Sequence, residues 1–426
     1  MRMMKASQWI SLLEQNELAG EFARLYPRDA AQQPGRYAAA LAAFCTRFGD
    51  EAATLFSAPG RTELCGNHTD HQRGKVLAAA VDKDMLAIAA PRSDGRILVC
   101  SKGFGETEVD LGDLSPRAEE RGTTAALLRG MAAGFVRAGY RAGGFEALVR
   151  SSVPGGAGLS SSAAFEVLAG TILSHFYNGG EVAPVAIAKL AQRAENDYFG
   201  KPCGLMDQCA CAVGGAVGID FFDAENPKIE KIPCDFGRMG FSLFVVNAGG
   251  SHANLTEEYA AIPAEMRAVA ACFGKNALAD VNGAEFRRAL PSLRGKVSDR
   301  ALLRARHFFM ENARVPLAAD ALHSGDGPAF RAAMLASGAS SANELENIYP
   351  CDGGQERSVS LALALSAELL EHAGGAWRVH GGGFAGTVQA LVPLELRERY
   401  RAEMNAVFGA DSCVELCVRP VGGWTA

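Results

Sequence analysis

The sequence predicts an α+β fold in two domains, on three observations. Short apolar runs cut by Gly, Asp and Pro indicate strands, mainly in the first half of the chain. In other segments apolar residues recur at three- and four-residue steps, which indicates helices. The polar segment 223–240 separates two compositions, and 426 residues are enough for more than one domain. The elements follow one another in groups, so we expect helices packed against sheets rather than strict βαβ winding.

The first half of the chain is expected to begin with helices over 1–50, where Trp9, Leu12 and Leu13 follow a helical spacing. Strands are predicted at 54–66, 75–81, 85–90, 96–101 and 144–152. A glycine-rich turn then leads into a helix within 153–176, and a second helix covers 184–200, ended by Gly200 and Pro202. The segment 204–222 begins as a helix and ends as a strand. These elements make up the first predicted domain, residues 1–235.

The second predicted domain, residues 236–426, starts with a strand at 241–247. Long helices rich in Ala and Arg are predicted at 257–273, 299–314 and 356–373. The chain then returns to strands at 376–383, 386–392 and 412–419. The domain boundary is placed at 235/236 because the composition changes within the polar segment around it.

Charge and cysteine content exclude several classes of protein. The formal net charge is −6 and no run of Lys or Arg occurs, so we expect neither nucleic acid nor a membrane surface as a partner. The eleven cysteines are odd in number and include no CxxC, which favours reduced thiols over a disulfide framework. The first residues suit an amphipathic helix and not a signal peptide, and no apolar stretch is long enough to span a membrane. A cytoplasmic location is expected.

The strongest local motif is the stretch PGGAGLSSSAAFEVLAG at 154–170. Gly155, Gly156 and Gly158 allow the backbone to turn tightly and to approach a ligand closely. Three serines follow at the start of a helix, whose free N–H groups favour an anion such as phosphate. The alternative is an ordinary serine N-cap after a glycine turn. The loop is not a Walker A motif, because the chain contains no GxxxxGK[ST].

Residues 66–71, GNHTDH, crowd two histidines and an aspartate into one short stretch. From these residues alone the stretch is a metal site, a sugar-binding segment or a polar turn. Asp207, within GLMDQ, lies among small and apolar residues and is either a functional carboxylate or a residue that caps a helix. The loop HGGGFAGT at 380–387 matches GxGxxG formally. The segment after it is strand-like, however, so the dinucleotide-binding interpretation fails.

Taken in order, PGRTELCGNHTDH, GLSSSAA, GLMDQ and HGGGFAGT resemble the GHMP kinase superfamily and, within it, the galactokinase family. AENDYFGKPCGLMDQ and RARHFFMENARV add to the resemblance, which covers most of the chain. It implies a sugar 1-kinase that uses ATP and Mg²⁺, working as a monomer or weak homo-oligomer. It also implies an N-terminal α/β domain and a C-terminal ferredoxin-like domain, with the active site in the cleft between them.

The resemblance assigns site residues by position. It makes Asp207 and Arg61 catalytic, the first as the group that orients or deprotonates the C1 hydroxyl. The implied ATP-binding set is Pro154, Gly155, Gly156, Gly158, Leu159, Ser160, Ser161, Ser162 and Ala163, with Ser101 as a candidate adenine contact. The implied Mg²⁺ ligands are Ser161 or Ser162 together with Glu195. The implied sugar-binding set is Asn67, His68, Asp70, Gly204 and Tyr259.

Three polar residues depart from the family signature, which runs roughly G-R-x-N-L-I-G-E-H-x-D-Y. Glu63 replaces the usual Asn, Asn67 replaces the usual Glu, and His71 replaces the usual Tyr. Asn67 carries no charge and both donates and accepts hydrogen bonds, so we hypothesise that it shifts the sugar preference. The alternatives are a kinase for a sugar altered at C6, such as galacturonate or L-arabinose, and a non-catalytic sensor that binds sugar and ATP. A kinase for mevalonate-like or homoserine-like substrates is disfavoured by HTD and GLMDQ occurring together.

Overall fold

A computed structural model describes residues 3–250, 255–350 and 355–426, which form a nine-stranded and a four-stranded sheet. In the larger sheet the strand order is β1-β2-β3-β6-β4-β5; β13 also pairs with β2, and β7 joins β3 to β8. All of its pairings are antiparallel except β4 with β6. The smaller sheet has the order β10-β11-β9-β12 and is antiparallel throughout.

The first half contains the larger sheet and its helices. Its strands are β1 (Met4–Lys5), β2 (Ala52–Cys65), β3 (Lys75–Arg92), β4 (Arg96–Ser101), β5 (Gly105–Asp110), β6 (Gly144–Ser151), β7 (Ala216–Asp220) and β8 (Lys228–Ile232). Its α-helices are α1 (Ala6–Glu14), α2 (Ala19–Leu25), α3 (Gln33–Phe48), α4 (Thr124–Arg137), α5 (Ser161–Asn178), α6 (Pro184–Arg193) and α7 (Met206–Val213). The N-terminal helices and the main predicted strands are confirmed.

The second half contains the smaller sheet and a group of long helices. Its strands are β9 (Phe241–Gly249), β10 (Ala376–His380), β11 (Gly386–Pro393) and β12 (Cys413–Leu416), with β13 (Trp424–Thr425) after them. Its α-helices are α8 (Thr256–Ala271), α9 (Gly283–Leu293), α10 (Asp299–Ser324), α11 (Gly327–Ser340), α12 (Ser358–Leu370) and α13 (Arg397–Phe408). Helix α10 extends ten residues beyond the predicted end, and α9, α11 and α13 were not expected from the sequence.

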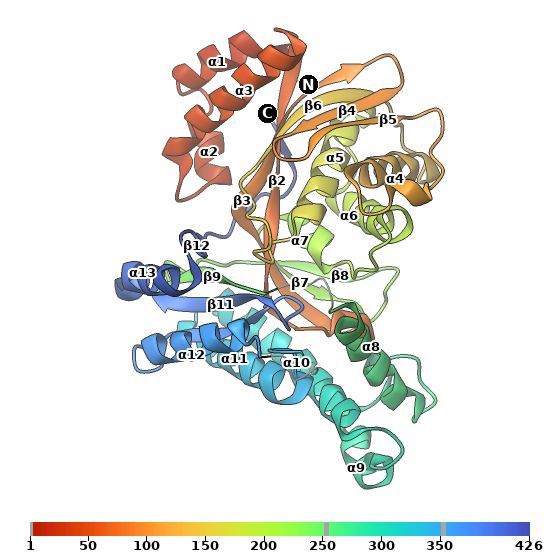
Figure 1. Ribbon diagram of the computed structural model, residues 1–426, viewed down its shortest axis with the longest axis vertical. Coiled ribbons are helices and arrows are strands. Elements are labelled where there is room, and N and C mark those ends of the chain that lie inside the picture. Colours follow the sequence, from red (N-terminus) through yellow and green to blue (C-terminus); the bar gives the residue numbers. More distant parts are fainter. Residues whose placement is uncertain (1–2, 251–254, 351–354) are drawn as a thin grey trace.

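The two faces of the larger sheet bury different helices, as Figure 1 shows. Leu55 packs in a core with residues of α1–α3, whereas its neighbour Phe56 packs in a core with residues of α4–α7. Successive side chains of a strand point to opposite faces, so alternating positions of β2 and β3 serve both cores. The continuous apolar character of these strands follows from burial on both sides.

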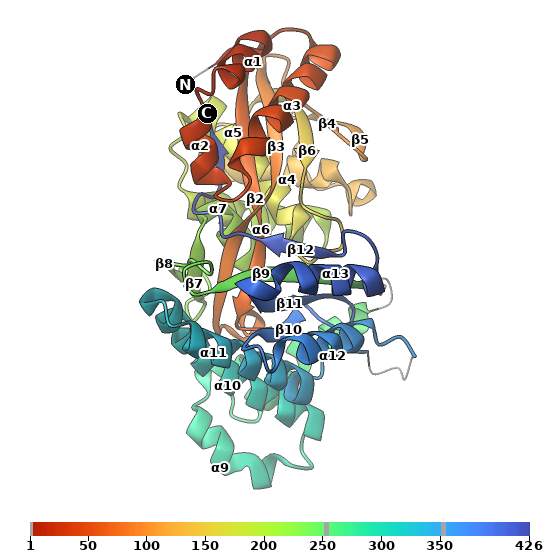
Figure 2. The ribbon, with the colours of Figure 1, turned by 90° about the vertical axis from the view of Figure 1, so that its left-hand side faces the viewer.

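The long strands β2 and β3 link the two halves of the molecule (Figure 2). Their lower parts contribute Leu64 and Leu77 to a core that also contains residues of β9, α10 and α11. The C-terminal end returns to the first half, because Val418 bridges Val81 and β13 pairs with β2. The last residues of the predicted second domain therefore lie on the sheet of the first.

The smaller sheet has the connectivity of a ferredoxin-like domain, with helices between β9 and β10, a direct β10–β11 connection, and α13 before β12. Within the described ranges, no helix combines the length and apolar character needed to cross a membrane. The ten described cysteines are free, in agreement with the expectation of unpaired thiols.

Candidate active site

The glycine-rich loop connects β6 to the first turn of α5, as its sequence predicts, and its glycines are exposed. Gly158 has a φ of +65°, and a Cβ there would lie 2.7 Å from Thr387 Oγ1 and 3.0 Å from His380 Nδ1. The loop thus sits directly against β10 and β11 of the other half of the chain. Ser160, just before α5, also has a positive φ (+55°), a conformation that costs a residue with a side chain of the order of 1–3 kcal/mol.

Arg61 and Asp207 form a bidentate ion pair beside this loop. Arg61 Nε lies 2.7 Å from Asp207 Oδ1, and Nη2 lies 2.6 Å from Oδ2. Arg61 Nη1 donates to the carbonyl oxygen of Gly158, and the backbone N–H of Arg61 donates to the carbonyl of Leu159 at 3.0 Å. Ser160 Oγ donates to Asp207 Oδ2 at 2.7 Å. The two predicted catalytic residues therefore meet at this glycine- and serine-rich segment, residues 154–162, which is the predicted phosphate loop.

These contacts fix the charge of Asp207. Burial alone would raise its pKa, but the guanidinium of Arg61 and the hydroxyl of Ser160 favour the anion and hold the pKa below its usual value. Asp207 is therefore an anion at neutral pH. Such a carboxylate accepts a hydrogen bond from an alcohol and receives a proton only as the alcohol oxygen gains a new bond.

Glu195 lies in a π-helical turn, Ala194–Phe199, which follows α6 directly and ends at Gly200. π-Helical turns are frequent at functional sites. The carboxylate of Glu195 accepts hydrogen bonds from Ser162 Oγ at 3.0 Å and Gln208 Nε2 at 2.8 Å, and Lys201 Nζ lies 3.3 Å from it. The three serines divide their contacts: Ser160 bonds Asp207, Ser162 bonds Glu195, and Ser161 is exposed at the first turn of α5.

Ser162 and Glu195 fit the donor set of a hard cation, because both offer oxygen atoms next to the first turn of α5. A second carboxyl, Glu166, lies behind them and shares Gln208 with Glu195. Burial, and then the charge of Glu195, raise the pKa of Glu166 well above its usual value. Glu166 therefore holds a proton more readily than an ordinary carboxyl group, and Glu195 is the carboxylate that shares its place with Ser162. In the described part of the chain no three His, Cys, Asp or Glu side chains form a metal site.

The turn GNHTDH connects β2 to β3, and its Asn67 side chain is fully buried. Asn67 Nδ2 donates to Glu63 Oε1 at 3.0 Å and to the carbonyl of Gly381 at 2.7 Å. Its Oδ1 accepts from Asn347 Nδ2 at 2.8 Å and from Ser341 Oγ at 3.3 Å. Both donors and both acceptor positions of this amide are occupied by the protein. A direct bond to a sugar requires Asn67 to give up one of them, and that contact stays a prediction.

His68 and Tyr259 hold the glycine loop 381–383 from either side. His68 Nε2 lies 2.9 Å from the carbonyl oxygen of Gly382, and Tyr259 Oη donates to that of Gly383 at 2.9 Å. A carbonyl oxygen only accepts, so His68 carries its proton on Nε2 and leaves Nδ1 as an acceptor. Burial, and then the neighbouring His71 ring, lower the pKa of His68 to about 4.

The predicted sugar-binding residues come together next to the catalytic pair. A Cβ on Gly204 would overlap Asp70 Oδ2, so the carboxylate of Asp70 lies against the backbone of Gly204. Gly204 is three residues before Asp207, at the start of α7. His71 is exposed and its ring stacks near that of His68, with ring centroids 5.9 Å apart. Asp70 therefore lies against the segment that leads into Asp207, and His68 reaches Gly382 in the other half of the chain.

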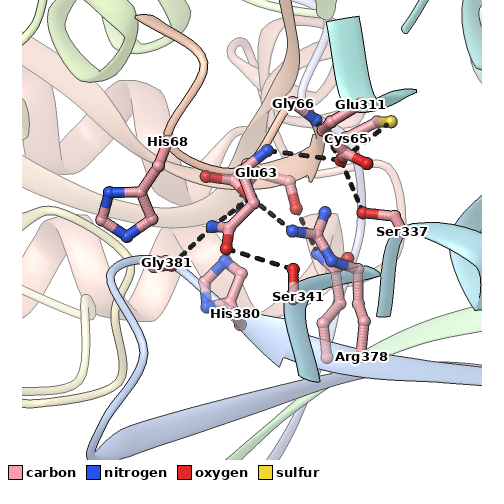
Figure 3. A network of polar contacts seen from close by, with 12 residues as sticks. Glu63, Cys65, Gly66, His68, Glu311, Ser337, Ser341, Arg378, His380 and Gly381 are labelled. Atoms are coloured by element: carbon pink, nitrogen blue, oxygen red, sulfur yellow. Dashed lines mark hydrogen bonds and ion pairs between the residues drawn. The ribbon is translucent and has the colours of Figure 1, made fainter. Parts of the chain in front are cut away.

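A buried polar network lies under the turn at residues 66–71 and contains Glu63, Arg378 and Glu311 (Figure 3). The sequence did not predict this network. Arg378 Nη2 lies 2.5 Å from Glu63 Oε1. Glu311 Oε1 accepts from the backbone N–H of Gly66 at 2.9 Å and of Asn67 at 3.3 Å. Glu63 and Arg378 are 315 residues apart in the sequence, so no local pattern signals their pairing.

The remaining predicted residues take supporting places. Pro154 is half-buried, and Leu159 and Ala163 are buried in the packing around the loop. Ser101 ends β4, which pairs in parallel with β6 and so reaches the edge of the sheet from which the phosphate loop leaves. Cys209 and Cys211, two residues apart on α7, are both fully buried in the apolar core.

The arrangement brings together an anion-binding helix start, an anionic carboxylate held by an arginine, and a cluster of hydrogen-bonding groups for a polar ligand. Phosphoryl transfer needs such positioning and charge neutralisation more than covalent catalysis. The Arg61–Asp207 pair lies between the phosphate loop and the cluster of His68, Asp70 and Gly204.

Comparison with known proteins identifies the family to which the chain is similar. A family model described as GHMP kinases N terminal domain matches residues 126–215, and one described as galactokinase galactose-binding signature matches residues 42–91. Galactokinase of Streptomyces coelicolor is 34% identical over 347 residues, covering 81% of this chain and 86% of the relative.

Solved structures agree at the level of fold. Lactococcus lactis galactokinase complexed with galactose superposes with a TM-score of 0.76 at 26% identity, covering 90% of this chain and 98% of that one. Methanococcus jannaschii mevalonate kinase superposes with a TM-score of 0.61 at 15% identity, covering 86% and 98%. The mevalonate kinase shares only the fold, whereas the Streptomyces relative also shares the sequence over most of both chains. The chain therefore belongs to the galactokinase family of GHMP kinases.

Proposed function

We propose that this chain transfers the terminal phosphoryl group of ATP to the C1 hydroxyl of galactose, giving galactose 1-phosphate and ADP. The observation that carries the proposal is the position of Asp207, held by Arg61 and Ser160 between the phosphate loop and the cluster of His68, Asp70 and Gly204. The similarity to the galactokinases of Streptomyces coelicolor and Lactococcus lactis supports galactose as the substrate.

In the proposed reaction Asp207 accepts a hydrogen bond from the C1 hydroxyl and aims its oxygen at the terminal phosphorus. As the new O–P bond forms and the bond to ADP breaks, the hydroxyl proton passes to a carboxylate oxygen of Asp207. Arg61 keeps Asp207 anionic until then and also places a fixed positive charge next to the transferred group. The free N–H groups at the start of α5 bind phosphate oxygens.

Ser162 and Glu195 would hold Mg²⁺, with exposed Ser161 next to them, and the ion would supply charge neutralisation on the phosphate oxygens when bound. The hydroxyl of Ser162 donates to the carboxylate of Glu195, so the oxygen atoms of both side chains lie close together. Serine hydroxyls and a single carboxylate leave most of the coordination positions of Mg²⁺ to phosphate and water, as this ion prefers.

For the sugar, His68 Nδ1 and the carboxylate of Asp70 are the proposed hydrogen-bond acceptors. His68 is neutral because its pKa lies at about 4, so it accepts from a hydroxyl throughout the physiological range. Asn67 acts on the sugar through the loop 381–383 that it holds, unless it exchanges one of its protein bonds for a sugar hydroxyl. If Asn67 shifts the sugar preference, it does so by setting the position of the loop 381–383.

The test is ADP release with ATP, Mg²⁺ and each of galactose, galacturonate, L-arabinose and N-acetylgalactosamine. Turnover with galactose is expected, and Asp207→Asn should lower kcat by about a thousandfold because the anion is lost. Turnover that is unaffected by that substitution contradicts the role of Asp207. A preference for galacturonate or L-arabinose over galactose supports the altered-sugar hypothesis for Asn67, and a strong preference for galactose alone refutes it.

A further inference from the structure

Lys201 carries a positive charge into the phosphate side of the site. It follows Gly200, which ends the π-helical turn that bears Glu195, and its backbone N–H donates to the carbonyl of Glu195 at 3.2 Å. The side chain is 63% exposed, yet its Nζ lies 3.3 Å from Oε1 of Glu195, whose side chain is only 2% exposed. The lysine thus reaches from solvent inward to a buried carboxylate.

The same carboxylate oxygen connects Lys201 to the start of α5. Glu195 Oε1 accepts the hydrogen bond from Ser162 Oγ at 3.0 Å, so Ser162 and the Lys201 ammonium are neighbours on one oxygen atom. Asp207, 12 residues after Glu195, is close enough for its charge, with that of Glu195, to raise the pKa of Lys201 despite partial burial. The ammonium therefore lies beside the first turn of α5, to which Glu195 and Ser162 connect it.

The donors of the two cations are used to different extents. Arg61 donates two N–H groups to Asp207 and one to the carbonyl oxygen of Gly158. An ammonium has three donors, and the bond from Lys201 to Glu195 uses one of them. The exposure of the side chain leaves the other two free to turn toward a ligand that enters from solvent.

A terminal phosphate that binds here meets the negative charges of Glu195 and Asp207. Arg61 offsets Asp207, and Lys201 offsets Glu195. Each cation therefore lowers the repulsion that a bound phosphate meets from the neighbouring carboxylate. A cation that contacts the terminal phosphate strengthens the binding of ATP more than the binding of ADP, because ADP lacks that group.

We propose that Lys201 is a catalytic residue that donates hydrogen bonds to oxygens of the terminal phosphate of ATP, while Glu195 holds its ammonium beside the start of α5. The proposal rests on the proposed use of ATP. It assigns Lys201 a contact with the transferred group itself, both before and during transfer. Charge that develops on that group in the transition state makes the contact stronger there than in the ground state.

The test compares ATP and ADP binding by calorimetry, without sugar and with Mg²⁺, in the wild-type chain and in Lys201→Met. Methionine keeps the length of the side chain and removes its charge. We expect ATP to bind about tenfold more weakly in the variant and ADP to change less than twofold. Lys201→Arg should recover part of the loss. Lys189→Met is the matched control: Lys189 lies on α6 and donates to the carbonyl of Glu225, away from the loop.

Kinetics supply the second readout. Lys201→Met should lower kcat by about tenfold or more with galactose KM unchanged, because the lysine touches phosphate and not sugar. Equal weakening of ATP and ADP, or no weakening of either, overturns the proposal. So does recovery of the variant by tenfold more Mg²⁺, because Lys201 would then act only through the metal ligand Glu195. If the wild-type chain binds neither nucleotide, the proposed function itself fails.

Discussion

The carboxylate of Asp207 accepts two hydrogen bonds from one guanidinium, Arg61, at 2.7 and 2.6 Å. Arg61 belongs to β2 and Asp207 to the first turn of α7, so the pair joins the larger sheet to this helix. Through Gly158 and Ser160 the same two side chains also hold the phosphate loop. The pair therefore controls both the charge of the catalytic carboxylate and the position of the loop.

Arg61→Met should move the acid limb of the pH–kcat profile to higher pH. In the wild-type chain Arg61 holds the pKa of Asp207 below its usual value, so the active anion is lost only at a pH lower than about 4. Without Arg61, burial acts unopposed and raises that pKa, so activity disappears at a higher pH. We expect kcat at neutral pH to fall about a hundredfold or more. Arg399→Met, which removes an exposed charge of α13 that pairs with Glu403, should leave the profile in place. An unmoved acid limb in Arg61→Met contradicts this account of Asp207.

Substitutions at Ser160 should separate backbone strain from the hydrogen bond to Asp207. Ser160→Ala loses the hydroxyl and keeps the side-chain penalty at a φ of +55°. Ser160→Gly loses the same hydroxyl but adopts that φ without strain. The glycine variant should be more stable than the alanine variant by about 1 kcal/mol in urea unfolding, with similar losses of kcat. Equal stabilities would show that the positive φ is not a feature of the folded chain.

Exchange of residues 63 and 67 should show strong coupling. Asn67 Nδ2 donates to Glu63 Oε1 at 3.0 Å, so Asn67→Glu replaces a donor by a second carboxylate beside Glu63 in a buried site and should destabilise the fold by about 3 kcal/mol or more. In Glu63→Asn with Asn67→Glu, one carboxylate and one amide remain, with Arg378 close by. A double-mutant cycle on free energies of unfolding should therefore give a favourable coupling of about 1–3 kcal/mol. Additive effects would mean that the two positions do not share this network.

Gly158 and Gly155 should respond differently to alanine. A Cβ at position 158 meets Thr387 Oγ1 and His380 Nδ1 and requires a φ of +65°, whereas a Cβ at position 155 meets nothing within 4 Å. Gly158→Ala should destabilise the fold by about 2 kcal/mol or more, because strain and overlap add. Gly155→Ala should stay within about 0.5 kcal/mol of the wild type. Thermal unfolding checks both variants, and equal shifts would contradict the packing of the loop against β10 and β11.

Elements with a strong local signal were predictable from the sequence. The glycines and serines at 154–162 gave the phosphate loop and the start of α5, and the β-branched run after the glycines at 381–383 gave β11. Helices α11 and α13 carried no such signal. Helix α13 is largely charged and buries only Tyr400 and Met404, so its apolar stripe is too sparse to stand out.

Within the site, the sequence indicated residue types and their order but not long-range partners. Resemblance to the family placed Asp207, Arg61, Glu195 and the sugar-binding set. It gave no sign of the Glu63–Arg378 pair, of Glu311 under the turn, or of Lys201 on Glu195. Glu63 and Asn67 were seen as departures from the signature, yet the reason they belong together appears only in the structure, where Asn67 donates to Glu63 within a buried polar network. Such pairings depend on how the two halves meet, and local patterns do not encode that.

The central claim is that Asp207 takes the C1 proton during transfer of phosphate from ATP to galactose. The most direct measurement is ³¹P NMR of the chain with ATP, Mg²⁺ and galactose, run in parallel with Asp207→Asn. The wild-type chain should form a sugar 1-phosphate and ADP in equal amounts, and the variant should form them about a thousandfold more slowly while still binding ATP and galactose. Equal rates in the two proteins, or ADP formed without a sugar phosphate, would contradict the account.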